Sequence, residues 1–290
     1  MIEPIGLILA GGAATRLKPV TTVVSKQLLP VYDKPVIYYP LTTLILAGFR
    51  KIALISTPNA LPNYQYLLGD GSQFGIEINY ITQQRPEGLA QAFLLTENLI
   101  KDRHSSLILG DNLFQGSMFG KDLISFTKTP GATAFAYAVE NPSDFGVLEF
   151  DQNGKVLSIE EKPKTPKSHW VIPGLYFFDT TVIERAKKIR PSARGELEIT
   201  DLNLSYFNEG LFTAIKIPRG NAWLDLGTPD GLLDAGDYVR HLQKRQGLPI
   251  GSPEEAAWRM KFIDIDQYQK IIDEQSNPHY KKLLLNTLEY

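Results

Sequence analysis

The sequence predicts an α/β fold: an open mixed β-sheet flanked by helices, with an antiparallel extension of the sheet and helices at the C-terminal end. Short apolar runs rich in β-branched and aromatic residues alternate with amphipathic stretches through the first half of the chain. From about residue 133 to residue 178 strand-like runs follow one another with little room for helices, and after Gly227 the apolar periodicity becomes helical. A chain of 290 residues, 43% of them hydrophobic, is long enough to bury the core that such a sheet needs.

The first half is expected to consist of parallel βαβ units. The stretch from Pro35 to Gly48 opens with proline and closes with glycine, and the stretch from Leu89 to Ile100 follows a Pro-Glu-Gly turn. Both are therefore predicted to be helices that cross between buried strands. The strands predicted around them are Ile5–Ala10, Ile52–Ser56, Ile78–Thr82 and Leu107–Leu109.

The second half is expected to extend the sheet with antiparallel strands. Turn sequences at Asn141-Pro142 and at residues 151–154 separate the apolar runs, which favours hairpins. The strands predicted here are Thr133–Val139, Val147–Phe150, Leu175–Phe178 and Ala214–Ile217. The helices predicted after them are Asp230–Gln246, Pro253–Lys261 and a segment from Asp264 onward that is interrupted at Asn277-Pro278.

Composition and charge exclude several functional classes. Thirty Lys and Arg against 32 Asp and Glu leave a net charge of −2, so no global field attracts nucleic acid or an anionic membrane surface. The chain has no cysteine, which excludes disulfides, thiolate metal sites and cysteine nucleophiles. No apolar run approaches the ~20 residues of a membrane-spanning helix, and the N-terminus lacks the basic start of a signal peptide. We expect a cytoplasmic protein that binds neither nucleic acid nor membranes.

The first candidate site is a turn of small residues after the first predicted strand. Gly11 and Gly12 follow that strand directly, and Arg16 comes shortly after them. Backbone N–H groups in such a turn can approach phosphate oxygens closely, and Arg16 adds a charged fork. The turn matches neither the Walker nor the dinucleotide-binding pattern, so a plain strand-to-helix turn remains an alternative. Lys26 either completes a triphosphate clamp with Arg16 or is a solvated surface lysine.

Charged residues at other predicted strand ends form further candidates. Asp111 and Asp225 each follow an apolar run, and two carboxylates that meet in space suit Mg²⁺, which keeps most of its waters. Taken singly, each aspartate would be a turn or cap residue. Glu161 and Lys162, together with Arg194, suit a phosphorylated sugar, because a carboxylate accepts hydrogen bonds from hydroxyls while the cations hold a phosphate. A solvated charge cluster is the alternative for this set.

Longer motifs surround these candidates at residues 9–17, 25–35, 67–73, 109–112, 160–163, 191–201 and 219–225. Together they resemble the motifs of the sugar-phosphate nucleotidylyltransferases, over nearly the whole chain up to about residue 260. The resemblance implies a Rossmann-like sheet and a nucleotidylyltransferase domain over residues 1–240. It assigns nucleotide binding to about 1–130, sugar binding to about 131–228, and an oligomer or regulatory role to a C-terminal helical extension over 241–290.

The resemblance also implies an activity, substrates and residue roles. The activity is the Mg²⁺-dependent transfer of a thymidylyl group from dTTP to α-D-glucose-1-phosphate, which gives dTDP-glucose and pyrophosphate and begins dTDP-L-rhamnose synthesis. The nucleotide is placed at Gly11, Gly12, Thr15, Arg16, Lys26, Gln83, Gly88 and Asp111. The hexose-1-phosphate is placed at Gly146, Glu161, Lys162, Tyr176 and Arg194, and Mg²⁺ at Asp111 and Asp225. The catalytic groups are Arg16, Lys26, Asp111 and Lys162. A homotetramer with a regulatory site at Arg219, Glu255 and Arg259 is implied as well.

Several residues depart from the family's usual pattern. Ala14 replaces a glycine, and if that backbone position needs φ > 0 the methyl group costs about 1–2 kcal/mol. On the sugar side the departures are Phe145, Pro173 and Leu226, so a sugar other than glucose stays open. Gln115 and Ser117 replace a tyrosine and a histidine of the regulatory region, which predicts weakened or altered feedback.

Three alternative functions were compared with this interpretation. A uridylyltransferase, or a transferase for another hexose phosphate, uses the same chemistry and stays open. A non-catalytic nucleotide-sugar sensor would be expected to lose Lys26 or an acidic metal ligand, and this chain keeps them. A nicotinamide-dependent dehydrogenase is excluded, because the glycine spacing is wrong and no acidic residue ends the second predicted strand.

Overall fold

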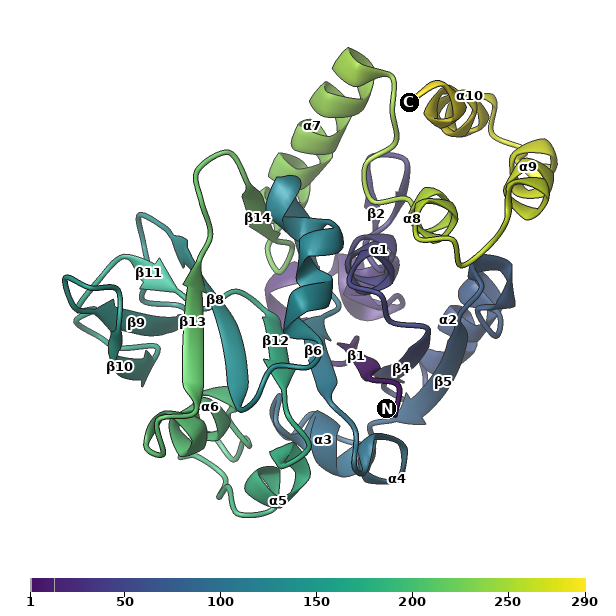
Figure 1. Cartoon of the computed structure of the whole chain (residues 1–290). Coiled ribbons are helices and arrows are strands. Elements are labelled where there is room, and N and C mark those ends of the chain that lie inside the picture. Colours follow the sequence, from purple (N-terminus) through teal and green to yellow (C-terminus); the bar gives the residue numbers. More distant parts are fainter. Residues whose placement is uncertain (1, 13) are drawn as a thin grey trace.

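The computed structural model describes residues 2–12 and 14–290 and confirms the predicted α/β class (Figure 1). The parallel part of its central sheet consists of β1 (Ile5–Leu9), β4 (Lys51–Ser56), β5 (Glu77–Thr82) and β6 (Ser105–Leu109). β1 lies between β4 and β6, and β5 follows β4 at the edge of the sheet. The carboxyl ends of these strands therefore meet at one edge, where open α/β sheets bind ligands.

Six further strands extend the sheet. They are β8 (Ala132–Ala138), β9 (Gly146–Phe150), β10 (Val156–Glu161), β11 (Trp170–Val171), β12 (Leu175–Phe178) and β13 (Phe212–Lys216). All of their pairings are antiparallel except that of β13 with β8. Between β11 and β12, Ile172 N donates to Gly146 O and Gly174 O accepts from Leu109 N, both at 2.8 Å. This linker thus joins the extension to the end of β6.

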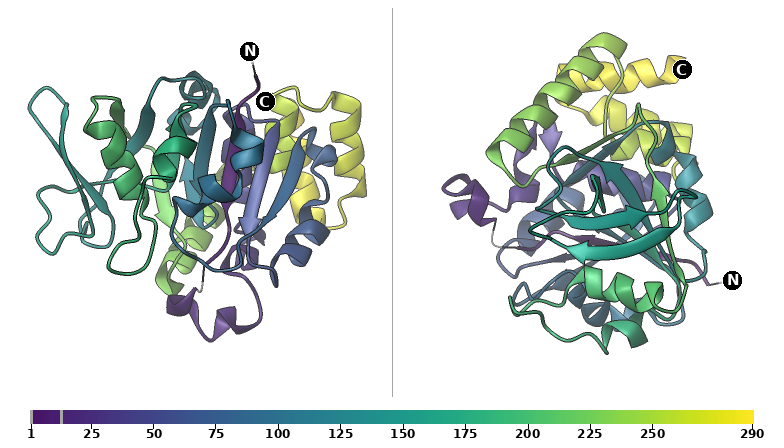
Figure 2. Two further views of the ribbon diagram at one scale, coloured as in Figure 1. Left: turned by 90° about the horizontal axis from the view of Figure 1, so that it is seen from below. Right: turned by 90° about the vertical axis from the view of Figure 1, so that its left-hand side faces the viewer.

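Helices cover both faces of the sheet (Figure 2). Ile8 packs into the core on one face with α1 (Tyr38–Leu46) and α2 (Leu61–Leu68). Leu7 and Leu9 point to the other face, as the alternation of a strand requires. The helices on that second face are α3 (Gln91–Leu95), α4 (Glu97–Ile100), α5 (Val182–Ala186) and α6 (Ile199–Phe207).

Each C-terminal helix begins at a polar side-chain cap, three of them followed directly by proline, and the interruption predicted at Asn277-Pro278 is confirmed. The helices are α7 (Pro229–Gln246), α8 (Pro253–Arg259), α9 (Ile265–Glu274) and α10 (Pro278–Asn286). Asn277 caps α10 by accepting from the backbone of His279 and Tyr280. α7 is continuous through residue 240. Among residues 2–12 and 14–290, no helix has both the length and the apolar character to cross a bilayer.

Some elements differ from the sequence-based expectation. The helix predicted over Leu89–Ile100 is interrupted at Thr96, whose Oγ1 donates to Ala92 O at 2.7 Å and competes with the helical pattern. The helix predicted from Pro35 begins at Tyr38, because Lys34–Pro35 (β3) pairs with Pro30–Val31 (β2) in a small hairpin. The elements that were not predicted include α2 and two short strands, β7 (Asn112–Gln115) and β14 (Ala222–Asp225).

Candidate active site

The turn after β1 opens a small cavity at the carboxyl edge of the sheet. Gly11, Gly12, Ser25 and Lys26 are among the residues that line its 170 Å³. Ala14, next along the described chain, has φ +44° and ψ +40°, which is the left-handed backbone region. A glycine adopts this conformation freely, whereas the methyl group of alanine makes it unfavourable. The expected backbone strain at this position is confirmed, and the Thr21 hydroxyl donates to Ala14 O at 3.0 Å.

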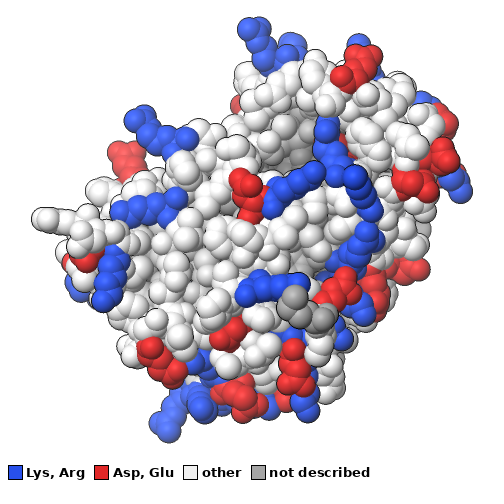
Figure 3. All heavy atoms as spheres, in the orientation of Figure 1, with Lys and Arg blue, Asp and Glu red and all other residues white. Residues whose placement is uncertain are grey.

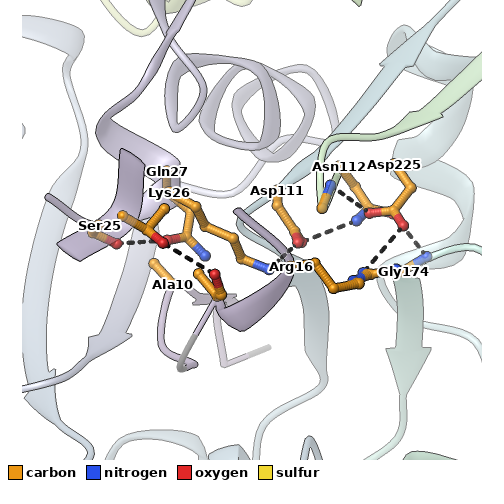
Figure 4. Close-up of polar contacts among 12 residues, drawn as sticks. Ala10, Arg16, Ser25, Lys26, Gln27, Asp111, Asn112, Gly174 and Asp225 are labelled. Carbon is orange, nitrogen blue, oxygen red and sulfur yellow. Dashed lines mark hydrogen bonds and ion pairs between the residues drawn. The ribbon is translucent and has the colours of Figure 1, made fainter. Parts of the chain in front are cut away.

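A buried polar network holds the Lys26 segment against the end of β1. The Ser25 hydroxyl donates to Gln27 Oε1 at 2.7 Å and lies 2.9 Å from the Tyr64 hydroxyl. Tyr64 in turn donates to Ala10 O at 3.4 Å. These bonds hold the Lys26 segment near Ala10, and Lys26 reaches Asp111 from there (Figure 4). Lys26 therefore belongs to the site and is not a free surface lysine.

Asp111 and Asp225 meet at the centre of the site. Asp111 follows β6, and Asp225 ends β14, which pairs with β7 so that Asp225 lies opposite Asn112. The backbone N–H of Leu226 donates to Asp111 O at 3.0 Å and fixes this approach. Lys26 Nζ contacts Asp111 Oδ2, and Arg16 Nη2 lies 3.8 Å from Asp225 Oδ2 (Figure 4). Four charged residues from distant segments therefore converge as the sequence predicted.

The electrostatics of this pair favour a cation. Burial raises the pKa of Asp225, and the neighbouring charge of Asp111 raises it further, against the opposing effect of Arg16 and Lys26. The described residues contain no group of three or more acidic or histidine side chains that could form a complete protein cage for a metal. Two carboxylates beside an open cavity are nevertheless the donor set that Mg²⁺ takes, because it keeps several of its waters.

A second cavity, of 190 Å³, lies where the β11–β12 linker meets the end of β6. Arg16, Asp111 and Asp225 line it together with Gly146 and Tyr176. Burial raises the pKa of Tyr176, and Glu161 raises it further, so its hydroxyl stays protonated. Lys26 lines the first cavity and contacts Asp111, which lines the second, so the two cavities adjoin at this ion pair.

Glu161 and Arg194 meet beside this second cavity. Glu161 Oε2 accepts from the Thr200 hydroxyl at 2.5 Å, and its Oε1 lies 3.4 Å from Arg194 Nη2. Arg194 is held more closely by Glu198, at 2.9 Å. The half-exposed guanidinium therefore retains free N–H groups for an anionic ligand, within reach of the carboxylate that faces the cavity.

Lys162 lines the same cavity on a strained backbone. Its φ is +43°, and its N–H donates to Phe145 O at 3.0 Å. Such a left-handed conformation at a lysine is uncommon and concentrates at functional sites. Of the departures on the sugar side, Phe145 lines the cavity, whereas Leu226 is buried in a separate small core with Val31 and is not a sugar contact.

The residues placed at the pyrimidine lie at the other end of the site. Gln83 follows β5, is 1% exposed, and donates through Nε2 to Gln91 Oε1 at 2.7 Å. Gly88 has φ +102° and packs on the backbone of Leu197, where a Cβ would stand 2.4 Å from both N and O. Thr15 begins the short 3₁₀ helix η1 (Thr15–Leu17) that carries Arg16, and it lines neither cavity.

The residues expected at a regulatory site are brought together only in part. Arg259 Nε donates to Glu255 Oε1 at 2.7 Å within α8, and burial raises the pKa of Glu255. Arg219 lies in the turn between β13 and β14. Across the described chain, no hydrogen bond or ion pair joins it to either residue.

Sequence reasoning missed three residues that organise the site. Asn112 Oδ1 accepts from Trp223 Nε1 at 2.6 Å and from Gly174 N at 3.2 Å, which joins β7 to β14 and to the β11–β12 linker. Its position directly after Asp111 was a sign of this role. Thr200 acts through a long-range bond to Glu161, which nothing local in the sequence indicates. Glu198 holds Arg194 four residues before it, and the close spacing of these two opposite charges was a local sign of that bond.

Charge on the molecular surface is mixed. Figure 3 shows Lys and Arg interspersed with Asp and Glu over the viewed face, with wide uncharged areas between them. An anionic ligand is therefore attracted by the local cations of the two cavities and not by a field of one sign.

Comparison with known proteins identifies the family. A model of the family described as nucleotidyl transferase matches residues 5–241. The chain belongs to this family. Curated relatives of this nucleotidyltransferase, each named glucose-1-phosphate thymidylyltransferase, include proteins of Mycolicibacterium smegmatis (54% identical), Mycobacterium tuberculosis (52%) and Neisseria meningitidis (48%). Each alignment covers 98% of this chain and 99% of the relative.

Solved structures agree with this assignment. A Bacillus anthracis protein assigned as a glucose-1-phosphate thymidylyltransferase, crystallised with sucrose, superposes with a TM-score of 0.75 at 36% identity. The match covers 82% of this chain and 95% of that one. A UDP-glucose pyrophosphorylase bound to UDP-glucose has the same fold, with a TM-score of 0.71 at 24% identity over 84% of this chain and all of the other. The chain is thus a nucleotidyltransferase enzyme with the fold of its family.

Proposed function

We propose that this enzyme transfers a thymidylyl group from dTTP to α-D-glucose-1-phosphate and forms dTDP-glucose and pyrophosphate. The observation that carries the proposal is the convergence of Asp111 and Asp225 with Lys26 and Arg16 between two adjoining cavities. The names of the relatives support the choice of dTTP and of glucose-1-phosphate.

The nucleotide occupies the cavity at the turn after β1. Gly11, Gly12 and Lys26 line this cavity, and Arg16 lines the adjoining one. In this proposal the N–H groups of the two glycines and the two cations bind the triphosphate, while Gln83, whose oxygen lies beside Gly11, and Gly88 bind the base. Both cations now contact carboxylates. A bound triphosphate competes for them, so these side chains exchange partners when the substrate arrives.

Asp111 and Asp225 hold Mg²⁺ in this proposal. When bound, the ion neutralises charge on the α-phosphoryl group and on the departing pyrophosphate. Its positive charge would offset the repulsion from Asp111 that contributes, after burial, to the raised pKa of Asp225.

The sugar phosphate occupies the second cavity, with its hydroxyls near Glu161, Gly146 and Tyr176 and its phosphate near Lys162 and Arg194. A phosphate monoester with a second pKa of about 6 is mostly a dianion at pH 7, so its oxygen attacks without a general base. The new bond joins that oxygen to the α-phosphorus, the bond from the α-phosphorus to the bridging oxygen breaks, and pyrophosphate leaves. Positioning and electrostatic stabilisation therefore account for catalysis.

The remaining expectations belong to the same proposal. We place the reaction in the cytoplasm and the product in dTDP-L-rhamnose synthesis. We propose a homotetramer, with the sequence divided into the domain over 1–240 and the extension over 241–290. Feedback through Arg219, Glu255 and Arg259 is expected to be weakened or altered. Unchanged initial rates in excess dTDP-rhamnose, with no second-site binding by calorimetry, would contradict the regulatory site, and sedimentation at micromolar concentration tests the tetramer.

The deciding experiment measures pyrophosphate release with Mg²⁺. Each of dTTP and UTP is combined with glucose-1-phosphate, galactose-1-phosphate and glucosamine-1-phosphate, and Asp111→Asn is the control. Release that is strongest with dTTP and glucose-1-phosphate and is lost in the control supports the proposal. Preference for UTP, or for another sugar phosphate, would replace the substrate assignment and leave the reaction class in place.

A further inference from the structure

We propose that Gln91, held by Glu87, fixes the side-chain amide of Gln83 so that its oxygen faces the nucleotide, and that this orientation selects pyrimidines carrying a proton on N3. The inference rests on the proposed function and deepens it. It assigns Gln91 and Glu87 as positioning residues for nucleotide specificity, although neither is among the candidate site residues that the sequence indicates.

Two groups of fixed polarity on Glu87 set the orientation of the Gln91 amide. The backbone N–H of Glu87 can only donate, and it donates to Gln91 Oε1 at 3.2 Å. The carboxylate of Glu87 can only accept, and its Oε2 accepts from Gln91 Nε2 at 2.8 Å. Exchanging the oxygen and nitrogen of Gln91 would place donor against donor and acceptor against acceptor. The Gln91 oxygen is therefore committed to the side where Gln83 lies.

The backbone around Glu87 is itself held in place. Leu197 N donates to Glu87 O at 2.7 Å, and Ala90 N donates to Leu197 O at 3.0 Å. Gly88 lies between these two bonds, packed against the Leu197 backbone. The loop before α6 thus holds the segment that carries Glu87. Because Glu87 bonds to the Gln91 amide, it holds that amide in one orientation.

Gln83 receives its polarity from Gln91. Its Nε2 donates to Gln91 Oε1 at 2.7 Å, so its own oxygen points away from Gln91. That oxygen lies beside the turn after β1, where a Cβ built on Gly11 would stand 2.3 Å from it. Within residues 2–12 and 14–290, no donor hydrogen-bonds to Gln83 Oε1. A nearly buried side chain therefore presents one bare acceptor to the nucleotide site.

A fixed acceptor distinguishes pyrimidines at N3. Thymine and uracil carry an N3–H that can donate to Gln83 Oε1, whereas cytosine presents a lone pair at N3 and leaves two acceptors facing each other. When a site contains one buried polar group, a ligand that cannot hydrogen-bond to that group leaves it unpaired and is strongly rejected. A site without such a group discriminates much less. The arrangement therefore admits dTTP and UTP and excludes dCTP, and it does not separate thymine from uracil.

The test compares nucleotides in variants of the full-length enzyme. Gln91→Leu and Gln91→Met remove the bond that orients Gln83. The matched control is Gln65→Leu, the same substitution at an exposed position of α2 that lines neither cavity. We would measure kcat/KM for dTTP and for dCTP by pyrophosphate release with glucose-1-phosphate, and the affinity for each nucleotide by calorimetry. We expect the dTTP preference to fall at least about tenfold in Gln91→Leu and Gln91→Met and to persist in Gln65→Leu.

The outcomes separate this inference from the proposed function. Equal losses of kcat/KM for dTTP and for dCTP in Gln91→Leu would identify Gln91 as merely structural and would overturn the inference. The proposed function would still stand if the wild-type enzyme is active with dTTP. A wild-type enzyme that binds dTTP and dCTP equally in calorimetry would also overturn it, whether or not product forms. Absence of wild-type turnover with dTTP, together with selective dTTP binding that Gln91→Leu abolishes, would contradict the proposed function and support the inference.

Discussion

Arg16 and Lys26 reach the two aspartates from different segments of the chain, and each cation has a different exposure. The Arg16 side chain is 57% exposed, whereas that of Lys26 is 17% exposed. An exposed ion pair such as that of Arg16 contributes little to folding stability. Its substitution therefore tests catalysis without a large effect on the fold.

Arg16→Ala is expected to lower turnover with dTTP and glucose-1-phosphate by about 10²–10³, because one charged group that stabilises the α-phosphoryl transition state is lost. The matched control is Lys18→Ala, which removes an exposed cation at the end of the same short helix, outside both cavities. Steady-state pyrophosphate release measures both variants. Turnover within threefold of wild type in Arg16→Ala would contradict the assigned role.

Asp225→Asn is expected to lose most activity and yet to stabilise the metal-free protein at neutral pH. Burial and Asp111 raise the pKa of Asp225 in the folded state. Ionisation therefore lowers the free energy of unfolding at any pH above the pKa of the unfolded chain, and this loss is complete once the pH also exceeds the raised folded value. Asparagine removes this unfavourable term.

The measurement is thermal unfolding in a chelator. We expect the melting temperature of Asp225→Asn to exceed that of wild type by about 2 °C at pH 7, and the difference to shrink as the pH falls toward the unfolded pKa. Asp230→Asn, at an exposed position in the first turn of α7, is the control and should lower the melting temperature only slightly, through the lost charge at the helix N-terminus. A lower melting temperature at pH 7 would show that the Arg16 and Lys26 contacts outweigh burial and repulsion.

Ala14→Gly is expected to stabilise the protein. The left-handed backbone costs alanine about 1–2 kcal/mol, while glycine gives back about 0.5–1 kcal/mol through the freer unfolded chain. The net gain in the free energy of unfolding is about 0.5–1 kcal/mol, measured by urea unfolding. Ala47→Gly, at a buried right-handed position after α1, has the opposite expected sign. Destabilisation of both variants would place the strain elsewhere.

At the scale of elements, prediction from sequence succeeds where burial alone imposes the pattern. β1 and β4 are continuous apolar runs because both of their faces are covered, and α7 has a clear polar and apolar periodicity with a Thr228 cap. β7 and β14 were missed because each is short and is stabilised by pairing with the other, across a long stretch of chain. Thr96 interrupts a helix through a hydrogen bond from its side chain to the Ala92 carbonyl, and the spacing of apolar residues gives no sign of that bond.

Gly88→Ala tests the contact between the loop before α3, which carries Gly88, and the loop before α6, which carries Leu197. The added methyl group would stand 2.4 Å from backbone atoms of Leu197, so one of the loops must move. We expect the free energy of unfolding to fall by about 2–3 kcal/mol and KM for dTTP to rise.

Gly154→Ala is the matched control for this variant. Gly154 also has positive φ, but nothing lies within 4 Å of its Cβ position, so only the backbone cost of about 1 kcal/mol is expected. Urea unfolding and dTTP kinetics of the two variants separate the collision with Leu197 from left-handed strain. Equal effects in both variants would show that the contact with Leu197 contributes nothing.

For the whole molecule, the charged centre of the site could be predicted and its surroundings could not. Asp111 follows β6, whose end lies at the edge where open sheets bind ligands, so its place in the site follows from a local pattern. Asp225 ends β14 in a separate two-stranded sheet, and its approach to Asp111 depends on the pairing of β14 with β7. The bonds from Thr200 to Glu161 and from Gln83 to Gln91 join segments whose approach depends on the packing of α3 and α6 against the sheet. Sequence periodicity carries no information on such contacts.

The C-terminal helices are tied to the rest of the molecule by a buried ion pair. Lys34 Nζ lies 2.6 Å from Asp33 Oδ1 and donates to Gln243 Oε1 of α7 at 3.0 Å. Gln243 Nε2 donates back to Asp33 Oδ2 at 2.8 Å, and the Lys34 ammonium lies 5.3 Å from the ring of Tyr280 in α10. Burial lowers the pKa of Lys34, against the opposing effect of Asp33. Removing either partner of this ion pair would leave the other charge buried and unpaired, which destabilises the fold.

Lys34→Met is therefore expected to lower the free energy of unfolding by about 3–5 kcal/mol, because it leaves the Asp33 carboxylate buried without its partner. Lys51→Met is the control: it breaks a pair with Glu77 at 3.8 Å whose side chains are 38% and 60% exposed, and it should change stability by less than about 1 kcal/mol. Urea unfolding compares the two variants. Limited proteolysis adds a local readout, because loosening of α10 in Lys34→Met should expose residues near Tyr280 before the sheet unfolds. Equal stability of the two variants would show that the C-terminal helices are held by apolar packing alone.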